Sequence, residues 1–196
     1  MEMNWKDWMG EFWGCLALTW VIAGAASGGI GATTLGLGVA MIILWATFSG
    51  AHIIPALTAA KMFNDQDWET GGMKLLWQIL GTVGFGVLAL ICGNAGTAGA
   101  DAAAIPFDDI THIVTMVVGG GILYTVWNRC DAWVTAFAVA AAFGAMSLGG
   151  GVAVGSMLAG LANEGSFGVN TLGTYVLDVV LAGVGGLLAV KVEEQL

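Results

Sequence analysis

Six long apolar runs set the strongest limit on what this chain can fold into. They lie near 8–26, 31–48, 72–92, 110–127, 132–150 and 171–190. Each comes close to the roughly 20 apolar residues that a transmembrane helix needs. The runs are continuous and lack the period-two alternation of a transmembrane β-strand. The sequence therefore predicts an all-α membrane protein with six transmembrane helices.

Composition excludes several classes of protein. Of the 196 residues, 58% are apolar and 10% are charged, whereas soluble domains average roughly 45–50% and roughly 25%. A soluble globular enzyme and a disordered chain are both excluded. Five Lys and Arg against 14 Asp and Glu exclude a nucleic-acid binder, which needs a basic face. The two His and three Cys lack catalytic or metal-ligand spacing, so we expect no enzyme activity, no metal and no cofactor.

Two shorter apolar stretches, 49–64 and 151–168, lie between the runs. Each is too apolar for an exposed loop and too short to cross a bilayer, so both are predicted to be re-entrant, enclosed by protein or a water-filled cavity. Each half of the chain then contains span, span, re-entrant segment and span. An odd number of spans makes the halves inverted repeats, at about 1–93 and 109–196. An outer loop, 94–108, joins them within one transmembrane channel domain, 1–196.

The basic residues predict the orientation. With six spans, all five fall on one side of the membrane: Lys6, Lys61, Lys74, Arg129 and Lys191. The positive-inside rule makes that side cytoplasmic. Both termini are therefore expected in the cytoplasm, in an integral protein of a plasma or inner membrane. The linker between the third and fourth spans contains Asp101, Asp108 and Asp109 but no basic residue, and it is expected outside.

The most specific motif lies in the first re-entrant stretch. Residues 49–58 are Ser-Gly-Ala-His-Ile-Ile-Pro-Ala-Leu-Thr. Pro55 suits the first position of a half-helix, whose positive dipole end would point into the membrane interior. The stretch resembles the first signature of the aquaporin (major intrinsic protein) family, Ser-Gly-x-His-x-Asn-Pro-Ala-Val-Thr. Ile54 stands where the family has Asn.

Weaker resemblances follow in the order in which the family has them. Residues 11–14, Glu-Phe-Trp-Gly, resemble the Glu-x-x-Gly of its first helix, and residues 78–81, Gln-Ile-Leu-Gly, the Gln-x-x-Gly of its third. Tyr175 and Gly183 lie near the Tyr and Gly of its sixth helix. The resemblance spans nearly the whole chain. It implies an aquaporin-like fold with two half-helices meeting at mid-membrane, and a homotetramer with one pore per subunit.

The second signature departs further from the family pattern. Many members have Ser-Met-Asn-Pro-Ala-Arg, whereas residues 156–161 are Ser-Met-Leu-Ala-Gly-Leu. This register puts Leu158 in the Asn place and Leu161 in the Arg place, and an alternative register puts Asn163 in the Asn place. The resemblance implies pore positions at His52, Ile54, Pro55 and Ala56 in the first motif, Leu158, Ala159 and Gly160 in the second, and a selectivity filter at Leu161, Gly155, Met146 and Thr34 or Leu35. It also implies that Glu11 and Gln78 support the re-entrant loops.

These replacements change the expected pore. Ile54 and Leu158 cannot donate hydrogen bonds to water, and Leu161 removes the fixed charge of the family's filter. A narrow apolar constriction tends to dewet. We expect passive permeation of a small neutral solute, with water, ammonia or a dissolved gas as candidates, so that a water channel is one case among three. The alternative is a non-conducting structural subunit that packs within a larger membrane complex; membrane lipid is a partner in both.

Several other residues have open interpretations. His52 either lines the cytoplasmic vestibule or packs as a hydrogen-bonded histidine, and His112 is expected to be structural. Asp178 stands where the family has an apolar residue or Gly; it faces a subunit contact or a partner, or it lies shallower than the span suggests. Trp side chains within the spans are expected to pack in the interior: Trp13, Trp20, Trp45 and Trp77.

Overall fold

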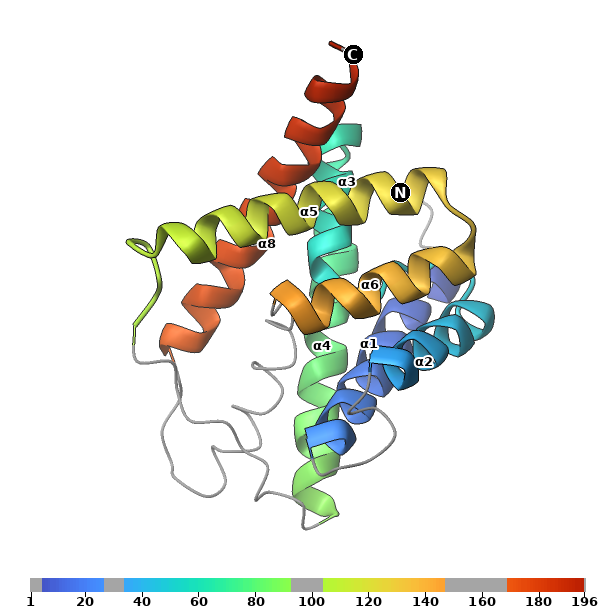
Figure 1. Cartoon of the computed structure of the whole chain (residues 1–196). Helices are drawn as coiled ribbons and strands as arrows, with labels where there is room; N and C mark the ends of the chain where they lie inside the picture. Colours follow the sequence, from blue (N-terminus) through green and yellow to red (C-terminus); the bar gives the residue numbers. More distant parts are fainter. Residues whose placement is uncertain (1–4, 27–33, 93–103, 147–168, 196) are drawn as a thin grey trace.

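The computed structural model describes residues 5–26, 34–92, 104–146 and 169–195, and the regular secondary structure of these ranges is helical. The helices are α1 (Trp5–Ala26), α2 (Thr34–Thr47), α3 (Pro55–Asp65), α4 (Trp68–Ile91), α5 (Ile110–Arg129), α6 (Ala132–Met146) and α8 (Val169–Glu193) (Figure 1). The prediction of an all-α protein is confirmed for the part of the chain that the structure describes.

Within the described residues, every predicted apolar run overlaps a helix. The first three runs lie on α1, α2 and α4, and the last three on α5, α6 and α8. Three helical segments are long and apolar enough to cross a membrane: Trp68–Ala89, Ile110–Arg129 and Val169–Glu193. The described apolar parts of α2 and α6 are shorter. The structure thus supports a membrane protein, and the count of six spans stays a prediction.

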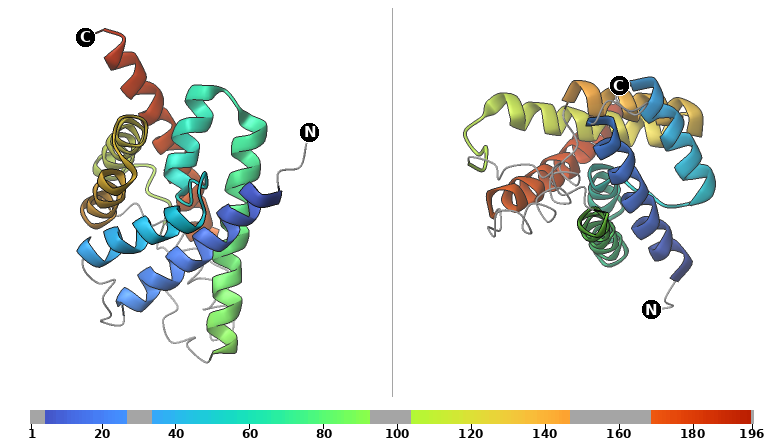
Figure 2. Two further views of the ribbon diagram at one scale, coloured as in Figure 1. Left: turned by 90° about the vertical axis from the view of Figure 1, so that its right-hand side faces the viewer. Right: turned by 90° about the horizontal axis from the view of Figure 1, so that it is seen from below.

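The long helices pack in pairs that relate the two halves of the chain. In the first half α1 packs along α4, and in the second half α5 packs along α8. Between the halves, α2 lies beside α6, and α3 packs along α8 (Figures 1 and 2). Each half therefore joins its first helix to its last, while the second helix of each half contacts its counterpart.

Glycines allow these helix pairs to approach closely. A side chain at Gly120 on α5 would meet the backbone of Ala182 on α8, and one at Gly185 would meet the backbone of α5. At the α1–α4 contact, a side chain at Gly81 would meet the backbone of α1. In lipid, helix association depends on such close packing, because the lipid tails are as apolar as the helix surfaces and the hydrophobic effect does not drive helices together. Some of the many glycines of the chain therefore lie where two helices cross closely.

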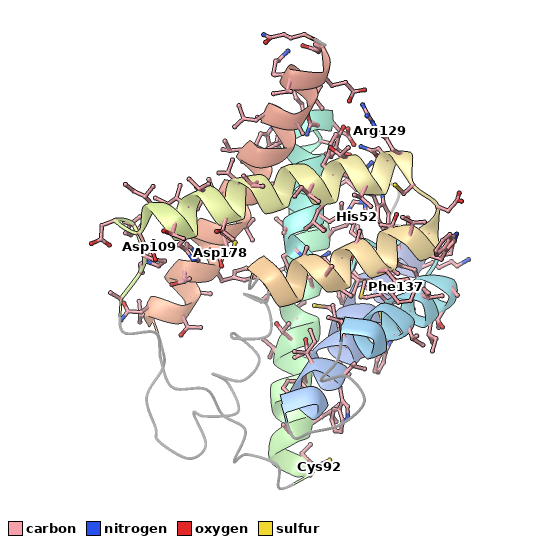
Figure 3. The ribbon with its side chains drawn as sticks, in the orientation of Figure 1. His52, Cys92, Asp109, Arg129, Phe137 and Asp178 are labelled. Carbon is pink, nitrogen blue, oxygen red and sulfur yellow. The ribbon has the colours of Figure 1, made fainter. Side chains whose placement is uncertain are left out.

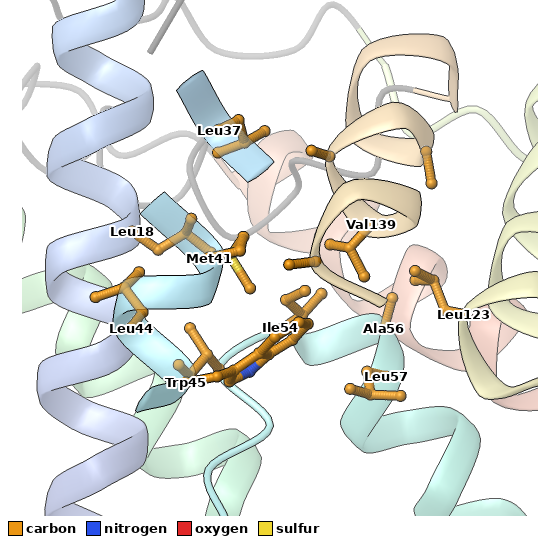
Figure 4. Close-up of a cluster of buried hydrophobic side chains, with 14 of the residues drawn as sticks. Leu18, Leu37, Met41, Leu44, Trp45, Ile54, Ala56, Leu57, Leu123 and Val139 are labelled. Carbon is orange, nitrogen blue, oxygen red and sulfur yellow. The ribbon is translucent and has the colours of Figure 1, made fainter. Parts of the chain in front are cut away.

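A cluster of buried apolar side chains forms where both halves meet (Figure 4). It draws on α1, α2, α3, α5, α6 and α8, and Trp45 is among its members. The expectation that tryptophans within the spans pack in the interior is wrong for Trp13 and Trp20, which are 47% and 41% exposed. Both lie on α1 away from the face that Glu11 and Cys15 bury in the protein.

Candidate functional site

Helix α3 begins inside the protein. Ile54 precedes it in an extended conformation, with φ −107° and ψ 119°, and Pro55 stands in the first turn. Proline suits this place because its ring presets φ and its missing N–H would have no helical partner. The Ile54 side chain is 0% exposed and gives the helix no side-chain cap. The positive end of the α3 dipole therefore faces buried hydrocarbon.

The loop between α2 and α3 contains two residues with left-handed backbone. Gly50 has φ +90° and Ile53 has φ +65°. Glycine adopts such angles at little steric cost, but a β-branched residue there is an outlier. Strain of this kind costs about 1–3 kcal/mol and persists only where surrounding structure imposes it. Ile53 must therefore be held in place by its neighbours.

The carboxylate of Glu11 on α1 holds this loop through hydrogen bonds to its backbone. The Glu11 side chain is 0% exposed. Its Oε1 accepts a hydrogen bond from the backbone N–H of His52 at 2.7 Å, and its Oε2 accepts one from Ile53 at 2.8 Å. Hydrogen bonds to a charged acceptor are short and strong. Two of them on adjacent residues fix the peptide groups on both sides of the His52 Cα.

Two side chains of α4 complete the surroundings of Glu11. Gln78 Nε2 donates to Glu11 Oε2 and to Thr58 Oγ1, both at 2.7 Å. Lys74 Nζ lies 3.3 Å from Glu11 Oε1 and donates to the carbonyl oxygen of Gly50, also at 3.3 Å. The buried carboxylate is thus both hydrogen-bonded and charge-paired, as a buried charge must be. Sequence reasoning missed Lys74, although its place one helical turn before Gln78 was a usable signal.

The structure brings the first-motif residues and their expected supports into one site. His52, Ile54, Pro55 and Ala56 lie at the start of α3, next to the group formed by Glu11 and Gln78. Three filter candidates, Thr34, Leu35 and Met146, belong to α2 and α6, and the positions of their side chains are not among those described. The remaining second-motif and filter positions lie outside the described residues: Gly155, Leu158, Ala159, Gly160, Leu161 and the alternative Asn163.

Bulky apolar side chains surround Ile54. Met41 of α2 is 0% exposed, and Leu123 of α5 and Val139 of α6 are each 1% exposed. Figure 4 shows Met41 and Val139 near Ile54 on two different helices, and Leu123 of the same cluster beside Ala56. Around the tip of α3, the described part of the interior is therefore packed hydrocarbon.

A pocket lined by several polar side chains, called the polar pocket below, lies along α3. This pocket has a volume of about 170 Å³ and is lined from α3, α4 and the loop before α3, by residues that include His52, Thr58, Lys61, Asp65 and Lys74. The side chain of His52 is 9% exposed, and its ring Nδ1 lies 3.3 Å from Thr58 Oγ1. His52 therefore both lines the pocket and is hydrogen-bonded, so the two interpretations of this residue are compatible.

A second polar contact joins α5 to α8. His112 Nε2 lies 2.7 Å from Asp178 Oδ1, and Asp109 caps α5 by accepting from the backbone N–H of His112 at 3.1 Å. Figure 3 shows Asp109 and Asp178 near the start of α5, far from Arg129 at its end. An acid within an apolar helix is costly unless it is paired, and His112 supplies that pairing for Asp178.

Together, the fold and the site define a protein that is helical in its described ranges, with three membrane-length apolar helices and a short helix, α3, whose buried start is held by a carboxylate. Comparison of the chain with protein-family models and with curated proteins gives no match. The similarity to aquaporins therefore rests on the motif residues of the chain itself.

Proposed function

We propose that the protein is an aquaporin-like channel through which a small uncharged solute permeates passively. The observation that carries this proposal is α3, an 11-residue helix with proline in its first turn and a fully buried residue before it. A helix too short to span a bilayer, with one end at buried depth, is the kind of re-entrant element that channel folds enclose in protein.

The pairing of the helices supports an inverted repeat. The α1–α4 contact of the first half corresponds to the α5–α8 contact of the second, and α2 meets its counterpart α6. An inverted repeat would supply a second half-helix from 151–168, outside the described residues. The aquaporin resemblance further leads us to propose a homotetramer with one pore per subunit.

The basic residues support one orientation in the membrane. Lys74 contacts Glu11 near the start of α1, and Arg129 at the end of α5 pairs with Glu193 at the end of α8. We call this end of the helix bundle the basic end. By the positive-inside rule it faces the cytoplasm, which places both termini there, in a plasma or inner membrane.

The surroundings of Ile54 indicate the kind of solute. A pore bounded by Ile54, Met41 and Val139 offers no hydrogen bond to a hydrated ion. The α3 dipole adds a positive potential that disfavours cations. Ammonia, water and dissolved gases are the small solutes for which such a route is open at a tolerable cost.

A second candidate function follows from the same packing. Ile54 and Met41 are 0% exposed, which is the condition of side chains that fill a core. A filled core is sufficient for a subunit that has this fold, packs within a larger membrane complex and conducts nothing.

Stopped-flow light scattering on proteoliposomes separates the two functions. Osmotic water flux and ammonia uptake are measured for the wild type, for Ile54→Asn and for the apolar control Ile54→Val. A channel predicts solute flux above that of empty liposomes, with water flux raised by Ile54→Asn and unchanged by Ile54→Val. The double change Ile54→Asn with Leu158→Asn should raise water flux further if Leu158 occupies the second Asn place. Background flux in every folded variant would favour the structural subunit.

A further inference from the structure

Three aromatic side chains meet beside Ile54 at the basic end. The ring centroids of Trp45 and Trp127 are 5.1 Å apart with an interplanar angle of 70°, and those of His52 and Trp127 are 5.7 Å apart at 80°. The three come from α2, the loop before α3, and α5. Since His52 lines the polar pocket and Trp45 belongs to the apolar cluster of Ile54, this aromatic group lies between pocket and cluster.

The indole of Trp45 carries a buried donor that the described part of the chain leaves without an acceptor. Its side chain is 8% exposed, and no group in the described part of the chain accepts a hydrogen bond from Nε1. A buried indole N–H usually finds a partner, and each exception in a folded protein calls for a reason. A solute that accepts from Nε1 would supply one.

His52 presents an acceptor on the other side of Trp127. Thr58 Oγ1 donates its single hydrogen to the carbonyl oxygen of Ile54 at 3.2 Å, and it accepts from Gln78 at 2.7 Å. Its 3.3 Å contact with His52 Nδ1 is then a bond in which the ring donates, so we assign the proton to Nδ1. The other ring nitrogen, Nε2, is left as an acceptor in a side chain that lines the pocket.

We propose that Trp45, His52 and Trp127 form a solute-binding constriction at the basic end. In it, Trp45 Nε1–H donates to a lone pair of the solute and His52 Nε2 accepts from one of its N–H or O–H groups. The inference rests on the proposed channel function and deepens it. It restricts the solute to small neutral molecules that both donate and accept hydrogen bonds, namely water or ammonia, and it disfavours apolar gases.

The test compares Trp45→Phe with Trp77→Phe. Both changes remove a buried indole N–H without a protein partner, but Trp77 lies among Trp5, Trp8 and Phe12, away from the constriction. Neither change removes a hydrogen bond within the described part of the chain, but each replaces a packed indole by a smaller ring and costs some stability, so thermal melts of both variants check that they fold. Water and ammonia fluxes are measured separately in proteoliposomes. Loss of one ordinary hydrogen bond to the solute should lower the flux of the permeant solute roughly two- to tenfold in Trp45→Phe and leave Trp77→Phe at the wild-type rate.

A second measurement does not depend on whether the protein conducts. Water-edited solid-state NMR on protein labelled with ¹⁵N-tryptophan detects transfer from water to the indole N–H of Trp45, assigned by its loss in Trp45→Phe. Wild-type flux that Trp45→Phe leaves unchanged would overturn the constriction while leaving the channel intact. If the wild type conducts nothing, the channel proposal fails; water transfer to Trp45 and not to Trp77 would still support the binding position, and its absence would overturn that too.

Discussion

The substitution Glu11→Gln tests whether one carboxylate holds the loop before α3. In the wild type, Glu11 accepts from the backbone N–H groups of His52 and Ile53 and from Gln78, and it pairs with Lys74. Glutamine offers only one acceptor oxygen in place of two. Whichever way the new amide turns, at least one of the two backbone donors faces an NH₂ group, and the ammonium of Lys74 loses its counter-charge.

The magnitude follows from what is lost. A hydrogen bond to a charged group contributes about 1.5–3 kcal/mol, and breaking a buried ion pair on one side costs about 3–5 kcal/mol. These terms overlap, because the charge strengthens the hydrogen bonds. Lys74 is also partly exposed, at 12% of its side chain, so solvent recovers some of its share. We expect Glu11→Gln to lower the free energy of unfolding by about 3–4 kcal/mol.

The assay is equilibrium unfolding in mixed detergent micelles, followed by tryptophan fluorescence. Glu69→Gln, at an exposed carboxylate in the first turn of α4, is the matched control and should leave the transition where it is. A double-mutant cycle with Lys74→Met gives the coupling between the two charges. Destabilisation of Glu11→Gln by less than about 1 kcal/mol would refute the argument that this carboxylate holds the strained Ile53 backbone.

Three further predictions concern the surroundings of the site. Gly185→Val should separate α5 from α8, because its side chain would meet the backbone of Val117, and a drop in the unfolding temperature measures this; an unchanged temperature would contradict the close crossing. Gly50→Ala should cost about 1 kcal/mol in unfolding free energy, since φ is +90° although the space is open; a stabilised variant would show that this backbone angle is wrong. Hydrogen bonds from the Thr70 hydroxyl and backbone hold the pKa of Asp67 below its ordinary value, so its stabilising contribution is present above the ordinary carboxyl pKa and lost as pH falls through the lowered one. An acid titration of stability should therefore be flatter in Asp67→Asn than in the wild type, and equal slopes would exclude that contribution.

The positions of the helices were predictable because their signal is local. Each apolar run is long and continuous, and the start of α3 is marked by Pro55, whose preference for a first helical turn depends on its own ring. The contact of Glu11 with the loop has no such local signal, because nothing in the spacing of residues 11 and 52 brings them together. It was expected only from the family resemblance. Contacts between segments far apart in sequence depend on how helices cross, and sequence periodicity does not specify the crossing.

Lys74 and the aromatic group illustrate that limit. Lys74 was predicted only as a marker of membrane orientation, but from the second turn of α4 its ammonium also reaches Glu11 and Gly50. Trp45 was correctly expected in the interior, while Trp13 and Trp20 were not told apart from it. All three lie on strongly apolar helices, and a helix that is apolar on every side gives little indication of which face it buries.

The residues that position α3 and the residue at its buried start differ in chemistry. Pro55 starts α3, and Glu11, Gln78 and Thr58 form a hydrogen-bonded polar group that holds the loop before it. The residue at the half-helix tip is different: Ile54 makes no polar side-chain contact and packs in hydrocarbon. An apolar replacement of a buried ion pair is often neutral or stabilising, so core stability alone gives little reason to bury the Glu11 carboxylate. The Glu11–Lys74 pair therefore supports the proposal that the geometry of the loop, and with it the position of His52 and Ile54, serves the channel.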